Sequence, residues 1–143
     1  MRYIGLDLGS KTLGVAISDV TNVIASGYTV IRFSSCDYEE ALLKLDSIIY
    51  DNGITHIVLG FPKNMDNTLG MRANVTLEFK DMLSKRYNLP VILVDERLTS
   101  VISNNVLIDA DMSRKKRKKV VDVLAATIIL QSYLDKWRNE NNE

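Results

Sequence analysis

Two short, uninterrupted apolar runs constrain the fold of this chain more than any other sequence feature. Residues 56–60 read HIVLG and residues 90–95 read PVILVD. Runs of this kind are typical of strands buried on both faces, as in parallel sheets covered by helices. The intervening residues 70–87 repeat apolar side chains at helical spacing, namely Val75, Phe79, Met82 and Leu83. We therefore predict two parallel strands connected by a helix.

The first third of the chain favours antiparallel strands instead. In residues 2–9 the apolar Ile and Leu side chains recur at every second position, which puts Asp7 on the opposite face. Residues 13–19 follow after a short turn and suit a hairpin, and residues 22–33 are rich in β-branched side chains. We predict three strands in this part of the chain.

Helices are predicted in three further segments. Asp37 fits an N-cap with Glu40 three residues later, so one helix is expected to run from there to Gly53. The other two are expected over residues 99–108 and 119–137, and the last is the most apolar. The order of these elements predicts a mixed α/β sheet in which two parallel strands extend three antiparallel ones.

Length and composition favour a single domain over residues 1–143. The chain has 143 residues and no repeat or linker segment. No apolar run approaches the roughly 18 residues that a membrane span needs, and the N-terminus is unlike a signal peptide, so we expect a cytoplasmic protein with no membrane partner. Cys36 and His56 are the only residues of their types, which excludes an internal disulfide and a zinc cage of Cys and His ligands.

One basic run dominates the charge distribution. The chain carries 18 basic and 18 acidic residues, but six of the basic ones form residues 114–119, which leaves 12 basic against 18 acidic residues elsewhere. Such a concentrated run in an otherwise acidic chain favours contact with a polyanion at one place. A solvated charge run in a loop is the alternative interpretation.

Three carboxylates lie where a purely structural sequence would not place them. Asp7 interrupts an apolar strand, where an unpaired charge is costly to bury, and Glu96 follows a buried strand at its carboxyl end, where open α/β sheets bind ligands. Asp122 is expected in the first turn of the last helix, where the helix dipole alone could also explain it. Such acids favour Mg²⁺ or Mn²⁺, and two ions of this kind promote phosphodiester hydrolysis. Together with the basic run, the acids indicate a nuclease.

Two loops are candidates for phosphate contacts. The glycine-rich residues 9–14 place Lys11 near Asp7, although an ordinary hairpin turn explains them equally well. Residues 60–67 follow the fourth predicted strand and are rich in turn-forming and polar residues. A plain strand-to-helix loop is the alternative there.

Four motifs together resemble one known family, the YqgF/RuvX family. They are D-L-G-S-K-T-L-G-V-A at residues 7–16, G-F-P-K-N-M-D followed by G-M-R-A within residues 60–73, D-E-R-L-T-S at residues 95–100, and V-D-V-L-A-A-T-I-I-L-Q-S-Y-L at residues 121–134. The family comprises RNase H-like proteins described as pre-16S rRNA nucleases or Holliday junction resolvases. The resemblance therefore implies an RNase H-like fold, with a five-stranded mixed sheet of order 3-2-1-4-5 and helices on both faces.

The resemblance also implies roles for individual residues. Asp7, Glu96 and Asp122 match the family's acids and are expected to be catalytic ligands of Mg²⁺ or Mn²⁺, with two ions bound. Asp95 is the alternative to Glu96, because neighbouring strand residues face opposite ways and only one of them can face Asp7. The expected substrate contacts are Lys11, Lys63, Asn64, Arg72, Arg97, Thr99, Arg114, Lys115, Lys116, Arg117, Lys118 and Lys119.

The expected activity is metal-dependent endonuclease cleavage of structured nucleic acid, in the 5′-end maturation of precursor 16S rRNA during ribosome biogenesis. One alternative is a DNA Holliday junction resolvase, which needs two active sites facing paired strands. Another is a non-catalytic nucleic-acid-binding module that uses residues 114–119. The expected partner is pre-rRNA or branched DNA, bound by a monomer or a homodimer.

Overall fold

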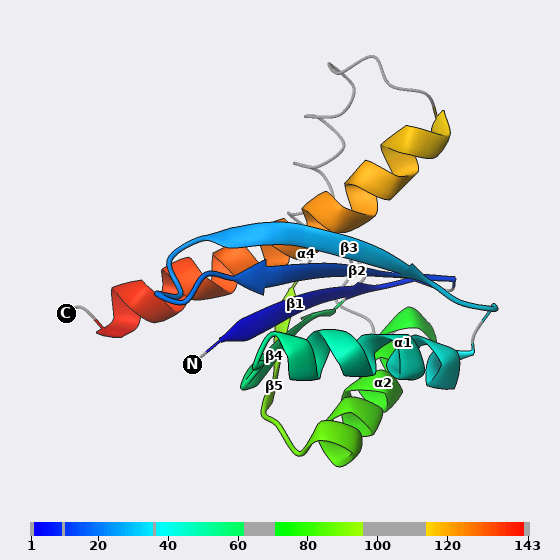
Figure 1. Cartoon of the computed structure of the whole chain (residues 1–143), viewed down its shortest axis with the longest axis horizontal. Coiled ribbons are helices and arrows are strands. Elements are labelled where there is room, and N and C mark those ends of the chain that lie inside the picture. Colours follow the sequence, from blue (N-terminus) through cyan, green and yellow to red (C-terminus); the bar gives the residue numbers. More distant parts are fainter. Residues whose placement is uncertain (1, 10, 36, 62–70, 96–113, 142–143) are drawn as a thin grey trace.

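A five-stranded sheet with the order β3-β2-β1-β4-β5 forms the centre of the chain (Figure 1). Its strands are β1 (Tyr3–Leu8), β2 (Thr12–Ser18), β3 (Ala25–Arg32), β4 (His56–Phe61) and β5 (Val91–Asp95). β1, β2 and β3 are antiparallel neighbours, whereas β4 and β5 extend the sheet from β1 in parallel. The computed structural model describes residues 2–9, 11–35, 37–61, 71–95 and 114–141. The predicted mixed sheet and its strand order are confirmed.

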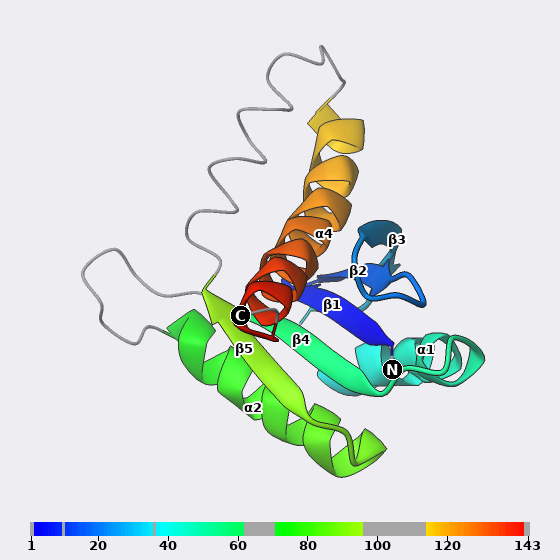
Figure 2. The ribbon, with the colours of Figure 1, turned by 90° about the vertical axis from the view of Figure 1, so that its left-hand side faces the viewer.

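Helices cover both faces of this sheet (Figure 2). α1 (Tyr38–Asp51) and α2 (Met71–Tyr87) pack on one face, and α4 (Arg114–Asn141) crosses the other. Asp37 caps α1 as predicted, because its side chain accepts a hydrogen bond from the Glu40 backbone N–H at 3.2 Å. The helix expected over residues 99–108 lies outside the described residues.

Alternation along β1 separates two apolar cores. Ile4, Leu6 and Leu8 are buried in the core that α1 and α2 cover. Tyr3 is buried in the smaller core beneath α4. Successive strand residues point to opposite faces, so Asp7 shares the α4 side of the sheet with Tyr3.

The β2–β3 turn is longer than the sequence indicates. The Asp19 carboxylate accepts hydrogen bonds from the backbone N–H groups of Val23 at 2.8 Å and Ile24 at 3.0 Å. These local bonds compete with strand pairing for the same donors. The strand expected over residues 22–33 therefore begins only at Ala25.

α4 begins earlier than predicted. It starts at Arg114 rather than at residue 119, so the basic run forms the first turns of the helix instead of a preceding loop. Lys and Arg are good helix formers, and neither Gly nor Pro interrupts residues 114–141. Asp122 is consequently the ninth residue of α4 and not a first-turn acid. The helix-dipole explanation of Asp122 is wrong, because that effect falls off within the first turn.

Candidate active site

Asp7 lies near the carboxyl end of β1, half-buried and between two positions that lack side chains. In the antiparallel ladder it pairs with Gly14 of β2. On the other side of β1, Leu6 pairs with Leu59 of β4, so the next residue of β4, Gly60, lies beside Asp7. Because glycine carries no side chain, the strands on either side of Asp7 leave room beside its carboxylate.

α4 packs directly on the backbone of β1 at Gly5. A Cβ atom at Gly5 would lie 2.7 Å from Leu130 Cβ and 2.9 Å from the Ala126 carbonyl oxygen. Only a residue without a side chain tolerates this approach. Gly5 therefore fixes how closely α4 lies over the strand that carries Asp7.

β1 and α4 run in opposite directions where they cross. The ring of Tyr133 lies 5.5 Å from that of Tyr3, whereas the Gly5 contact comes from residues earlier in α4. Toward the carboxyl end of β1, the next residue after Gly5 on this face is Asp7. Toward the start of α4, Asp122 lies one helical turn before the Gly5 contact. The two elements carry these predicted acids toward the same end of the sheet (Figure 1).

β5 contributes to the same face by alternation. Ile92 and Val94 pack against the α4 core, whereas Leu93 packs against the core on the α1 and α2 side. Glu96 lies outside the described residues, directly after the carboxyl end of this strand. β5 pairs in parallel with β4, which pairs in parallel with β1, so all three carboxyl ends meet at the end of the sheet where Asp7 lies.

The remaining predicted site residues divide into three groups. Lys11 is exposed in the β1–β2 turn. Arg72 lies at the start of α2, and residues 114–119 form the start of α4; the structure describes the backbone of these positions. The others lie outside the described residues and are Lys63, Asn64, Arg97 and Thr99.

The described side chains contain no group of three His, Cys, Asp or Glu residues that could hold a metal ion. Asp7 is the one member of the predicted trio whose side chain is among them. No helix in the described part of the chain is long and apolar enough to span a membrane.

The glycine-rich opening behaves as a hairpin turn. The Gly9 N–H donates to the Thr12 carbonyl oxygen at 2.7 Å, so this donor is used within the turn. The Lys11 carbonyl oxygen accepts a hydrogen bond from the Phe33 N–H at 3.0 Å, which fixes the turn against the end of β3. Any contact with a phosphate here falls to the Lys11 side chain rather than to the Gly9 backbone.

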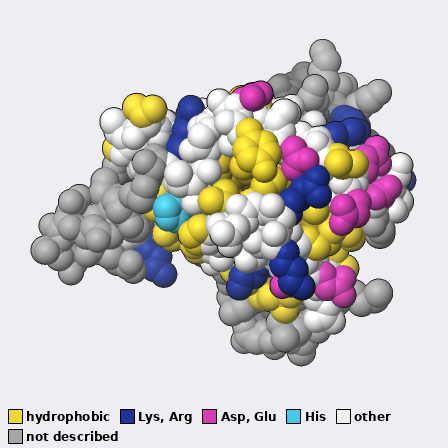
Figure 3. All heavy atoms as spheres, turned by 60° about the horizontal axis from the view of Figure 1, so that its bottom comes forward, with side chains coloured by type: hydrophobic (Ala, Val, Ile, Leu, Met, Phe, Trp, Pro, Cys, Tyr) yellow, Lys and Arg dark blue, Asp and Glu magenta, His cyan; other side chains and the backbone are white. Residues whose placement is uncertain are grey.

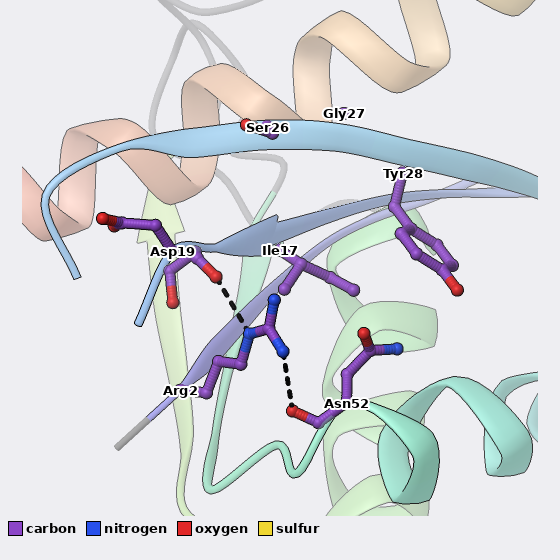
Figure 4. Close-up of a pocket in the computed structure, with 8 residues that line it drawn as sticks. Arg2, Ile17, Asp19, Ser26, Gly27, Tyr28 and Asn52 are labelled. Atoms are coloured by element: carbon purple, nitrogen blue, oxygen red, sulfur yellow. Dashed lines mark hydrogen bonds between the residues drawn. The ribbon is translucent and has the colours of Figure 1, made fainter. Parts of the chain in front are cut away.

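A pocket of about 260 Å³ lies at the opposite end of the sheet (Figure 4). Arg2 occupies its wall, where Nε donates to the Ser18 carbonyl oxygen at 3.1 Å and Nη1 donates to the Asn52 carbonyl oxygen at 3.3 Å. These bonds join the start of β1 to the end of β2 and to the end of α1. We assign the pocket a structural role, because both interactions hold elements together.

The single histidine also lies far from Asp7. The His56 ring stacks on the Tyr3 ring with 4.6 Å between centroids, at the start of β4 and β1. Burial, and secondarily the positive N-terminus, lower the pKa of His56. The position of His56 therefore separates it from the candidate site around Asp7.

The face formed by α1 and α2 does not resemble a phosphate-binding surface. Its Lys and Arg side chains are interspersed with Asp and Glu (Figure 3). Arg86, for example, binds Asp46 through two hydrogen bonds of 2.8 and 2.6 Å. Near the Asp7 end of the sheet the structure adds Arg32, a residue that sequence reasoning missed and that forms no ion pair with another described residue. The position of Arg32 near Asp7 becomes apparent only once β2 and β3 are paired.

Comparison with known proteins agrees with this architecture. A family model described as "RuvX: Holliday junction resolvase" matches residues 1–136. A protein of Bacillus subtilis (strain 168), named "Putative pre-16S rRNA nuclease", is 50% identical over 135 residues, which are 94% of this chain and 98% of that protein.

Two solved resolvases share the fold at low sequence identity. The Fowlpox virus resolvase in complex with substrate Holliday junction DNA is 17% identical, with a TM-score of 0.60 over 96% of this chain and 99% of that one. T. thermophilus RuvC in complex with its Holliday junction substrate is 14% identical, with a TM-score of 0.57 over 97% and 96%. The RNase H-like fold expected from the sequence is confirmed.

Proposed function

The chain belongs to the RuvX family, and we propose on this basis that it is the nuclease of that family which trims structured RNA, at the 5′ end of precursor 16S rRNA, in the cytoplasm. The observation that carries the proposal is the position of Asp7. A half-buried carboxylate lies between two glycine positions on the face of the sheet that α4 covers. A purely structural strand would place an apolar side chain there.

We assign Asp7, Glu96 and Asp122 as the catalytic acids. The backbone supports Asp122, which lies one helical turn before the Gly5 contact. We choose Glu96 over Asp95 because residues 92 and 94 of β5 face α4, and an extended backbone would place residue 96 on that face.

This donor set fits a hard divalent cation. Carboxylate oxygens are the ligands that Mg²⁺ and Mn²⁺ prefer, and the described histidine lies at the other end of the sheet. We propose two ions; when bound, they supply water activation and stabilisation of the leaving oxygen. Asp7, Glu96 and Asp122 would hold them.

The chain's cations would orient the substrate. We assign Arg97 and Thr99 to the phosphate that is cleaved, since they directly follow Glu96 in sequence. The flanking backbone would be held by Lys11, Lys63, Asn64, Arg72 and residues 114–119. The basic run supports this role, because six consecutive basic residues at a helix start oppose the helix dipole and are not explained by helix stability.

Cleavage of two labelled substrates tests the proposal: a precursor 16S rRNA fragment and a four-way DNA junction, each with Mn²⁺. Wild-type protein is expected to cut the RNA, and Asp7→Asn to cut it at least about 100-fold more slowly, since even partners of metal ligands cost 10- to 100-fold when removed. Asp81→Asn, a substitution of an exposed acid on α2, is the matched control and should cut normally. Equal activity of Asp7→Asn, or no cleavage of either substrate by wild type, contradicts the proposal.

The description of the family model and the two resolvase structures favour junction cleavage as the second candidate. Cleavage of the DNA junction alone would establish it, and it also requires a dimer, because a resolvase cuts two strands. If both substrates are bound and neither is cut, the chain is a binding module. Neutralising Lys115, Lys116 and Lys118 together would then abolish salt-dependent binding.

A further inference from the structure

Arg32 and Lys11 form an exposed cationic pair at the Asp7 end of the sheet. Arg32 is the last residue of β3 and pairs with Thr12 of β2. The hydrogen bond between the Phe33 N–H and the Lys11 carbonyl oxygen, at 3.0 Å, holds the β1–β2 turn against this strand end. The two side chains are therefore anchored to neighbouring backbone positions.

Arg32 lies on the same face of the sheet as Asp7. Its neighbours Ile31 and Phe33 are both buried in the core on the α1 and α2 side, so Arg32 takes the opposite side, which α4 covers. Asp7 pairs with Gly14, and Gly14 pairs with Val30, two residues before Arg32. Two strand spacings of about 4.8 Å and two residues of about 3.3 Å separate the Cα atoms of Asp7 and Arg32 by about 12 Å.

The charges of Lys11 and Arg32 are not paired within the part of the chain that the structure describes. Among the described residues, neither Lys11 nor Arg32 forms an ion pair. Lys44 shows the contrast: it lies 3.4 Å from Glu40 and donates to the Arg32 carbonyl oxygen at 2.6 Å. That bond fixes the backbone of Arg32 and leaves its guanidinium available. An exposed Arg with no carboxylate partner among the described residues suits a phosphate, which it can bind through two N–H groups.

We propose that Arg32, with Lys11, binds the phosphate backbone of the substrate on the β3 side of the site. A separation of about 12 Å lets Arg32 reach a phosphate only a few nucleotides away from the one at the proposed acids. Arg32 thereby sets which part of the strand reaches the acids, while the basic start of α4 binds another part. This inference rests on the proposed nuclease function and adds a substrate-positioning residue to it.

Salt-dependent binding measures this contact without requiring cleavage. The probe is a fluorescently labelled four-way DNA junction in EDTA, titrated with wild type, Arg32→Gln, Arg32→Lys and Lys136→Gln. Lys136 is an exposed lysine of α4, three residues after Tyr133 and so at the opposite end of the sheet, and it serves as the charge-matched control.

Removing one phosphate contact is expected to reduce the slope of log affinity against log salt by about 0.9. When salt rises from about 50 to 200 mM, the loss of affinity of Arg32→Gln should therefore be about 3.5-fold smaller than the loss of affinity of wild type. Arg32→Lys should keep the wild-type slope, because it keeps the charge, and so should Lys136→Gln. In cleavage assays Arg32→Gln should raise KM more than it lowers kcat.

A wild-type slope for Arg32→Gln, or an equal loss of slope for Lys136→Gln, overturns the assignment. In either case normal RNA cleavage by wild type leaves the proposed function standing. Absence of both binding and cleavage by wild type overturns the two together. An unchanged melting temperature of Arg32→Gln shows that its lower slope reports a lost contact and not unfolding. If Arg32→Gln is less stable than wild type, the slope of Arg32→Lys provides the same check.

Discussion

Gly5 links stability to the candidate site at the scale of a single residue. A methyl group at this position would meet Leu130 Cβ at 2.7 Å and the Ala126 carbonyl oxygen at 2.9 Å. The second contact is backbone, so α4 has to shift as a unit to relieve it. Gly5→Ala is therefore expected to lower the free energy of unfolding by about 1–3 kcal/mol, the usual range for overpacking a core.

Urea denaturation of Gly5→Ala measures this effect as a lower midpoint. Gly53→Asn is the control: Gly53 has φ +60° and no atom within 4 Å of a built Cβ, and Asn tolerates that backbone conformation. Its midpoint should change little. If Gly5→Ala unfolds at the wild-type midpoint, the close packing of α4 on β1 is contradicted.

The surroundings of Asp7 show how far sequence reasoning reaches for one residue. Alternation along residues 2–9 correctly separates Asp7 from the main core, because that pattern is local. Gly60 could not be identified as its neighbour, since Gly60 lies 53 positions away and comes beside Asp7 only through the register of β1 and β4. Arg32 was missed for the same reason: its face depends on the pairing of β3 with β2.

At the scale of elements, one polar cluster ties α1 to α2. Arg86 donates to both Asp46 carboxylate oxygens, and the Tyr87 hydroxyl donates to Asp46 Oδ1 at 2.7 Å. The Arg86 guanidinium, and secondarily the Tyr87 hydroxyl, lower the pKa of Asp46. The side chains of Asp46 and Arg86 are 30% and 29% exposed, so solvent weakens the pair only in part.

Asp46→Ala is expected to cost about 1–2 kcal/mol at pH 7, since it removes charged hydrogen bonds. Because the folded-state pKa is lowered, the contribution of Asp46 is present in full above the ordinary value of 3.8 and is lost as the pH falls through the folded value. The difference in free energy of unfolding between wild type and Asp46→Ala should therefore narrow below about pH 4. Thermal unfolding followed by circular dichroism from neutral to acidic pH measures it.

Asp81→Ala provides the matched control on α2. It breaks the Lys85–Asp81 pair, whose side chains are 77% and 63% exposed, and exposed pairs contribute about 0–1 kcal/mol. A loss as large as that of Asp46→Ala would show that helix propensity or net charge, and not the link between α1 and α2, sets the effect. A gap that stays constant to low pH would contradict the role of the carboxylate.

Elements were predictable where their signals are local. The N-cap at Asp37 marks the start of α1, and the apolar runs of β4 and β5 mark where these strands begin and end. The start of α4 was misplaced because the charge of the six-residue basic run, and not its helical propensity, guided the prediction. Lys and Arg are nevertheless good helix formers, and the helix dipole opposes only the charges of the first turn, at a cost of about 0.3–1 kcal/mol for a well-placed charge.

At the scale of the whole molecule, the two ends of the sheet have different roles. Asp7 lies where the carboxyl ends of β1, β4 and β5 meet, and Lys11 and Arg32 lie at the same end of the sheet. The other end contains Arg2 bound to two carbonyl groups and the stacked His56. The mixed sheet was predicted from the order of the elements and its strand order from the family resemblance. The position of α4 relative to β1 depends instead on the close packing at Gly5, which neither of these indicates.

If the three proposed acids meet only in the folded chain, a divalent cation must stabilise the native state by mass action. At a Mn²⁺ concentration tenfold above its Kd, the gain is about 1.4 kcal/mol for one site. Mn²⁺ should therefore raise the melting temperature of wild type and of Asp81→Asn, while Asp7→Asn loses most of the increase. Differential scanning fluorimetry across a Mn²⁺ titration separates these cases without substrate. An equal increase in Asp7→Asn would place the metal elsewhere on the chain, because a neutral amide at position 7 cannot replace a carboxylate ligand at equal affinity.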